Sequence, residues 1–103
     1  MIIQITADGQ VDFIDRENFK AFKITAPATH GSVEALAKAL GGVAQVADDG
    51  KTAWVSQDAL RRWGGQPQPA EWIAAFDRMI ESVKRFGWID EAAGTVRGHI
   101  ELV

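Results

Sequence analysis

The chain has 103 residues, of which 47% are hydrophobic and 24% charged, a composition typical of a folded globular domain rather than a disordered segment. Its formal net charge of −3 argues against nucleic acid as a partner, because the phosphates of nucleic acids attract basic surfaces. The chain has no cysteine, which excludes disulfides, thiolate catalysis and cysteine-ligated metals. No apolar run approaches the ~20 residues that cross a bilayer, and the first residues do not read as a signal peptide. We therefore expect a cytoplasmic protein that does not enter a membrane.

An internal repeat is the most informative pattern in the chain. Residues 2–22 resemble residues 43–63 without a gap. Three identities anchor the match: Gln4/Gln45, Asp8/Asp49 and Gly9/Gly50. Repeats of this kind mark a supersecondary unit whose copies bury apolar surface against each other. The repeat predicts a single domain over residues 1–103, in which two similar units are related by a pseudo-twofold axis.

Each copy begins with a predicted β-hairpin. The predicted strands are residues 2–6 and 11–14 in the first copy, and residues 43–47 and 52–55 in the second. An Asp-Gly pair separates the two strands in each copy. This pair suits a tight turn, because both turn positions need a positive φ.

A short helix should follow each hairpin. Ser56–Trp63 reads as a helix with Ser56 as its N-cap. In the first copy, residues 19–25 by themselves would equally fit a strand. The repeat favours a short helix over Asp15–Phe22 instead.

A second helix completes each copy. The first runs over Ser32–Leu40 with Ser32 as N-cap. The other is longer, over Pro69–Phe86, with proline at the first helical position, where its missing N–H costs nothing. Its apolar residues recur at steps of four and three and should form the main core stripe: Trp72, Phe76, Met79 and Val83.

The chain closes with a third predicted hairpin, made of residues 88–90 and 95–102 around a turn. Gly98, inside the last strand, indicates a bulge or a close approach of another group to the backbone. The predicted fold class is α+β: two hairpin–helix–helix copies plus a C-terminal hairpin. In this arrangement, one or two antiparallel sheets pack against one long amphipathic helix.

Tryptophan supplies two of the candidate binding residues. Trp72 and Trp88 have no equivalent in the other copy, and tryptophan is enriched at interfaces and in ligand pockets. Packing in the core or at the helix end is the competing explanation for both. The aromatic residues at matched positions of the repeat are expected in the core: Phe13, Phe22, Trp54 and Trp63.

Three polar residues complete the set of candidates. His30 and Ser32 lie at the start of a predicted helix, where backbone N–H groups, a hydroxyl and an imidazole could hold an anion. Simple capping by Ser32 is the alternative. Arg61 lies near Trp63, as in proteins that bind nucleic acid, although a solvated helix face explains this pattern as well.

The chain contains no pattern typical of a metal site, a phosphate-binding loop or a nucleophile elbow, so we predict no cofactor and no catalytic residues. The sequence favours a non-catalytic interaction module that forms a homodimer through a sheet edge or the long helix, or binds another protein. One alternative is a protein that binds a small acidic ligand in a tryptophan-lined pocket. A further alternative is a nucleic-acid-binding module that uses the C-terminal hairpin as a wing.

Overall fold

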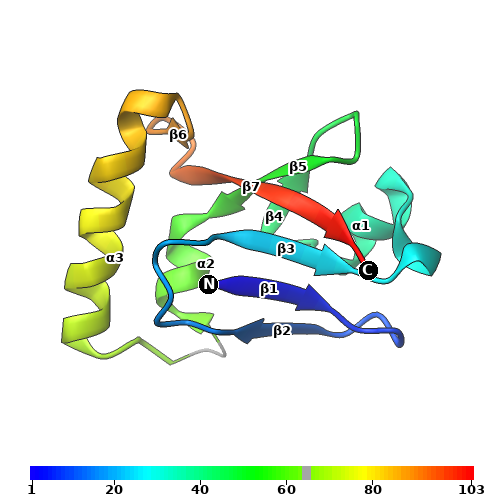
Figure 1. Cartoon of the computed structure of the whole chain (residues 1–103), viewed down its shortest axis with the longest axis horizontal. Coiled ribbons are helices and arrows are strands. Elements are labelled where there is room, and N and C mark those ends of the chain that lie inside the picture. The colour runs from blue at the N-terminus through cyan, green and yellow to red at the C-terminus, as the bar shows by residue number, and fades with distance from the viewer. Residues whose placement is uncertain (64–65) are drawn as a thin grey trace.

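The described residues of the computed structural model, 1–63 and 66–103, form a curled sheet of seven strands with three α-helices, an α+β arrangement (Figure 1). The strands are β1 (Ile2–Ile5), β2 (Val11–Ile14), β3 (Lys23–Ala26), β4 (Ala44–Val46), β5 (Thr52–Ser56), β6 (Ile89–Asp90) and β7 (Thr95–Leu102). The helices are α1 (Val33–Ala39), α2 (Gln57–Arg61) and α3 (Ala70–Val83), with 3₁₀ turns η1 (Ala28–His30) and η3 (Lys84–Phe86). No helix within these two ranges is long and apolar enough to cross a membrane.

The sheet is mixed, which corrects the prediction of purely antiparallel sheets. Its strand order is β2-β1-β3-β7-β5-β4. Strand β6 pairs with β7 on the same edge as β3 but with earlier residues of β7. The pairs β1–β3 and β3–β7 are parallel, and the other pairs are antiparallel. After the first hairpin, the chain returns to the free edge of β1 rather than extending from β2. Strand β3 therefore runs in the direction of β1.

The short helix predicted over Asp15–Phe22 is wrong, because this segment consists of turns. Asp15 has a φ of 50°, outside the helical range. The ammonium group of Met1 donates hydrogen bonds of 2.6 and 2.7 Å to the carbonyl oxygens of Asn18 and Ala21. These bonds hold the segment in its turns and lead it into β3. The strand that residues 19–25 alone suggested is present as Lys23–Ala26.

The two repeated hairpins both form, but their registers differ by one residue. In the first hairpin, Ile3 lies opposite Phe13. The ungapped repeat would place Ala44 opposite Trp54, whereas the observed partner of Trp54 is Gln45. A slip of one residue moves a side chain to the other face of a sheet. Phe13 is therefore buried, whereas Trp54 lies on the opposite face, and its predicted core position is wrong.

The longer second turn causes this slip. The first turn is closed by a hydrogen bond from the N–H of Thr6 to the carbonyl of Gln10. The second is closed by a bond from Ala47 to Thr52, which encloses one more residue. The Asp-Gly pairs still lie in the turns, but the predicted positive φ at both positions is wrong: Gly9 and Gly50 have φ values of 83° and 67°, whereas Asp8 and Asp49 do not have a positive φ.

The core lies between one face of the sheet and the helices. Alternate strand residues and one side of each helix form a single buried cluster, which includes Ile3, Ile24, Val55, Val96, Leu36, Leu60, Trp72, Phe76 and Met79. Helix α3 occupies most of the predicted range, but Pro69 is its N-cap and not its first helical residue as predicted. The helix lies at the left in Figure 1, opposite α1. Since the helices pack on this one face, the strand residues between the buried ones point to an uncovered face.

Gly98 confirms the predicted close approach to the backbone. Strand β6 pairs with β7 at Thr95 and Val96, and β3 pairs with β7 from His99 onward. Gly98 therefore lies in the short interval between β6 and β3. A Cβ atom on Gly98 would lie 3.2 Å from Cε2 of Phe22, so the ring of Phe22 uses the space that glycine leaves.

Replacement of Gly98 by valine is expected to lower the free energy of unfolding by about 1–3 kcal/mol, because the added atoms overpack against Phe22 and Ile24. Urea denaturation followed by circular dichroism measures the change. The double variant Gly98→Val/Phe22→Leu should be more stable than Gly98→Val alone, because the smaller side chain restores space. An unchanged unfolding free energy in Gly98→Val would show that Phe22 does not pack against this backbone.

Candidate functional site

The uncovered face of the sheet holds the candidate site. Along β7, Arg97 and His99 alternate with the buried residues Val96, Gly98 and Ile100 and so point away from the core. On the neighbouring strand β5, Thr52 and Trp54 alternate with buried residues in the same way. The register pairs Thr52 with His99 and Trp54 with Arg97. Polar and aromatic side chains from two strands are thus brought side by side on an open surface.

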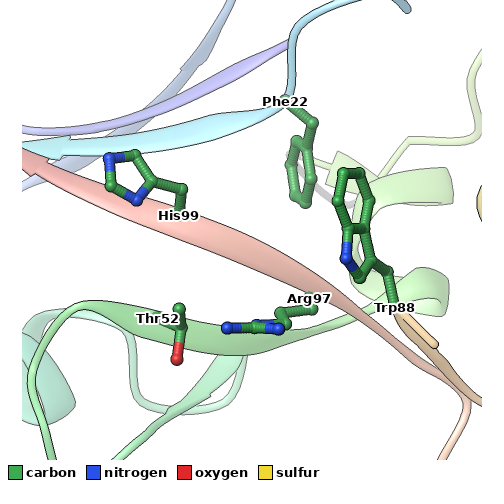
Figure 2. A pocket seen from close by; sticks show the side chains of 5 residues that line it. All are labelled: Phe22, Thr52, Trp88, Arg97 and His99. Carbon is green, nitrogen blue, oxygen red and sulfur yellow. The ribbon is translucent and has the colours of Figure 1, made fainter. Parts of the chain in front are cut away.

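A hollow of about 230 Å³, here called the sheet-face hollow, lies on this face and is lined by Phe22, Thr52, Trp88, Arg97 and His99. In Figure 2 the rings of Phe22 and Trp88 lie side by side at one end, while the side chain of Arg97 extends toward Thr52. The hollow exists because β3 and β6 do not meet along β7. Phe22 precedes β3 and Trp88 precedes β6. The two rings therefore border the gap between these strands, beside Gly98 of β7.

Arg97 gives the hollow a positive charge. It is the one formally charged side chain among the described residues that line the hollow, and no carboxylate there is within ion-pair distance of it. The nearby Lys23, by contrast, forms an ion pair of 3.2 Å with Glu101. The exposed guanidinium of Arg97 is therefore available to an anion from solution.

Trp88, a residue predicted from the sequence, forms the apolar wall together with Phe22. Its side chain is 42% exposed, and its ring centroid lies 5.0 Å from that of Phe86, which is 53% exposed. Tryptophan is enriched at interfaces and in ligand pockets, because it combines a large apolar ring with an N–H donor. The structure thus places Trp88 where a ligand could contact it.

Trp72 lies away from this hollow, in the core. It is 7% exposed and stacks on Phe76 with ring centroids 5.1 Å apart. Its indole N–H donates a hydrogen bond of 2.8 Å to the carbonyl oxygen of Arg16. These contacts favour the structural explanation of Trp72 over a binding role.

His30 and Ser32 lie at the other end of the fold. Ser32 is the N-cap of α1, and its hydroxyl accepts a hydrogen bond of 3.1 Å from the N–H of Ala35. His30 borders a separate surface hollow of about 520 Å³ together with Asp8 and Lys38. The hydroxyl of Thr6 donates to Asp8 and lowers the pKa of its carboxyl group. Simple capping thus accounts for Ser32, and His30 faces a carboxylate as well as a cation.

Arg61 is the last residue of α2 and is already paired with a residue of α3. Its guanidinium forms an ion pair with Asp77 and lies 4.9 Å from the ring centroid of Phe76. Nearby, the hydrogen bonds that the Lys84 ammonium donates to Glu81 and, second in effect, to Glu91 raise the pKa of Lys84. The charges on this side of the molecule neutralise one another. The structure therefore does not bring the five predicted residues together: His30 and Ser32 lie near each other, the other three lie in separate regions, and only Trp88 borders the sheet-face hollow.

The sequence interpretation missed Phe22, Thr52, Arg97 and His99 as a group. One usable signal was the alternation over residues 95–102, which places Arg97 and His99 on the same face of a strand. The juxtaposition with Thr52 and Phe22 depends on pairings across long stretches of sequence, which one sequence does not reveal.

Among the residues that the structure describes, no group of three or more histidine, aspartate or glutamate side chains converges to hold a metal ion. Comparison with protein-family models, with curated proteins and with solved structures finds no significant match to this chain.

Proposed function

We propose that this chain is a binding module for a small acidic ligand and that its site is the sheet-face hollow. The observation that carries the proposal is the guanidinium of Arg97, which lies in a hollow whose described lining contains no carboxylate. Arginine can bind a carboxylate or phosphate through two parallel hydrogen bonds. The anionic group of the ligand is assigned to Arg97, with Thr52 and His99 as further hydrogen-bonding groups.

The rest of the ligand is assigned to the aromatic wall of Phe22 and Trp88. A ring of the ligand can pack edge-to-face or offset against these side chains. The volume of about 230 Å³ is below the ~300–1,000 Å³ typical of sites for drug-sized molecules. The hollow therefore suits a ligand portion of about one ring with its acidic group.

Paired probes test this proposal. Benzoate and phenyl phosphate are compared with their neutral counterparts, benzamide and phenol, by isothermal titration calorimetry and by the shift in melting temperature. Each charged probe should bind at least about ten-fold more tightly than its neutral counterpart, because a hydrogen bond to a charged group contributes about 1.5–3 kcal/mol. Equal binding within each pair, or no binding of either charged probe at millimolar concentration, would contradict the proposal.

Self-association is a second candidate function, favoured by the exposed aromatic pair Phe86 and Trp88. A homodimer that covers this pair predicts a mass near 22.4 kDa by light scattering at high protein concentration, twice the 11.2 kDa of one chain. The variant Phe86→Ser should then return the mass to 11.2 kDa. A monomer mass for the unaltered protein at all concentrations would rule out this candidate.

A further inference from the structure

A transverse row of side chains crosses the open face beside the hollow. Trp54 on β5 is the register partner of Arg97 on β7. On the other side of β7, the N–H of Arg97 donates a hydrogen bond of 2.8 Å to the carbonyl oxygen of Trp88. The row therefore reads Trp54, Arg97, Trp88, with the cation between two indole side chains.

Both ends of this row are accessible to a ligand. Trp88 lines the hollow described above. Trp54 lines a neighbouring hollow together with Lys84, Ile89, Asp90 and Glu91. Trp54 is also the one tryptophan without an aromatic partner among the described residues, so its ring face is not covered by another ring.

We propose that the site extends across this row to Trp54 and that its ligand is a dinucleotide, in which two bases flank a phosphate. The inference rests on the proposed binding of an acidic ligand at Arg97. The phosphate is assigned to Arg97, one base to the hollow of Phe22 and Trp88, and the other base to Trp54. Bases of any kind stack on aromatic side chains, and a basic group between them neutralises the phosphate.

The spacing of the row fits this assignment. Neighbouring strands lie ~4.8 Å apart, so the backbones of Trp54 and Trp88 are about 10 Å apart with Arg97 midway. Indole side chains can lean toward each other over part of that distance. A base, a phosphate and a second base in an extended dinucleotide follow in the same order as the three side chains.

The charges around the row favour a dinucleotide over a longer strand. Asp90, Glu91 and Lys84 border the hollow of Trp54, and Lys84 is already paired with Glu91 at 3.0 Å and with Glu81. Further along the face, Glu101 pairs with Lys23. Phosphates beyond the central one would therefore meet carboxylates, in a chain whose formal net charge is −3. Near Trp54, a carboxylate can instead accept a hydrogen bond from an amino group of a base.

Trp54→Leu tests the inference against the binding of AMP and of the dinucleotide ApA. ApA should bind the unaltered protein about ten-fold more tightly than AMP, because it can use the second stacking surface. The variant should lose that advantage and bind AMP as the unaltered protein does. Gln45→Ala, at the neighbouring position of β4, is the matched control and should retain tight binding of ApA. Retained AMP binding also shows that Trp54→Leu is folded.

Four outcomes would overturn the inference. ApA that binds no more tightly than AMP, or an unchanged ApA affinity in Trp54→Leu, removes the second subsite while the proposed binding of an acidic ligand stands. Decaadenylate contains nine overlapping dinucleotides and should bind no more than about nine-fold more tightly than ApA. Tighter binding than this would mean that the ligand is a longer strand and not a dinucleotide. Failure of benzoate, phenyl phosphate and AMP alike would remove the proposed function itself, and the dinucleotide with it.

Discussion

Replacement of Trp72 by alanine is expected to lower the free energy of unfolding by about 3–5 kcal/mol, because it removes the largest side chain of the buried face of α3. The indole stacks on Phe76 and packs against Phe13 and Phe19, with ring centroids 5.1–6.2 Å apart. In a domain of this size, such a loss lowers the melting temperature by at least about 12 °C. Differential scanning calorimetry measures the change.

Trp72→Phe is the matched variant, because it retains a ring and removes the indole N–H. It should cost only about 1 kcal/mol, since water can replace the hydrogen bond to the carbonyl of the exposed residue Arg16. Residue 72 does not border the sheet-face hollow, so the Trp72→Phe variant should bind benzoate as tightly as the unaltered protein. Loss of benzoate binding at unchanged stability would instead make Trp72 a site residue, as one interpretation of the sequence suggested.

Replacement of Arg97 by glutamine is expected to weaken the binding of benzoate and phenyl phosphate by at least about ten-fold, because the neutral amide cannot supply a charged double hydrogen bond. Binding of benzamide and phenol should stay the same. The unfolding free energy should change by less than about 0.5 kcal/mol, since Arg97 is exposed and its backbone pairing is retained. Calorimetric titration and urea denaturation give the two quantities.

Arg78→Gln provides the control for a change in net charge, because Arg78 is an exposed arginine on α3 outside the lining of the hollow. It should leave the affinity for benzoate unchanged. Equal losses of affinity in both variants would mean that the general charge of the protein, and not Arg97 in its hollow, attracts the anion.

Local patterns predicted many of the elements correctly. The Asp-Gly turns, the N-caps Ser32 and Ser56 and the C-terminal hairpin all appear, because each depends on a few neighbouring residues. Where the sequence prediction failed, contacts between residues far apart in the sequence determine the local structure. The ammonium group of Met1 holds the segment before β3 in turns, and no local pattern over residues 15–22 shows that contact.

The candidate site was less predictable than the fold. One extra residue in the turn between β4 and β5 moves Trp54 from the expected core to the open face, and an ungapped repeat conceals that shift. Arg97 meets Trp88 within one hairpin, but Phe22, just before β3, and Thr52, on β5, reach the same hollow from distant parts of the sequence. Trp88 was identified because it had no equivalent in the repeat, not because its neighbours were known.

The indole N–H signals of the four tryptophans provide the most direct test of binding at the open face. They can be followed by ¹H–¹⁵N nuclear magnetic resonance during titration with benzoate, after assignment with single Trp→Phe variants. If benzoate binds in the hollow, the signal of Trp88 should shift in a saturable manner, while that of buried Trp72 stays in place. A saturable shift of Trp72 with Trp88 unmoved, or no shift of any indole signal, would contradict a binding site on the open face of the sheet.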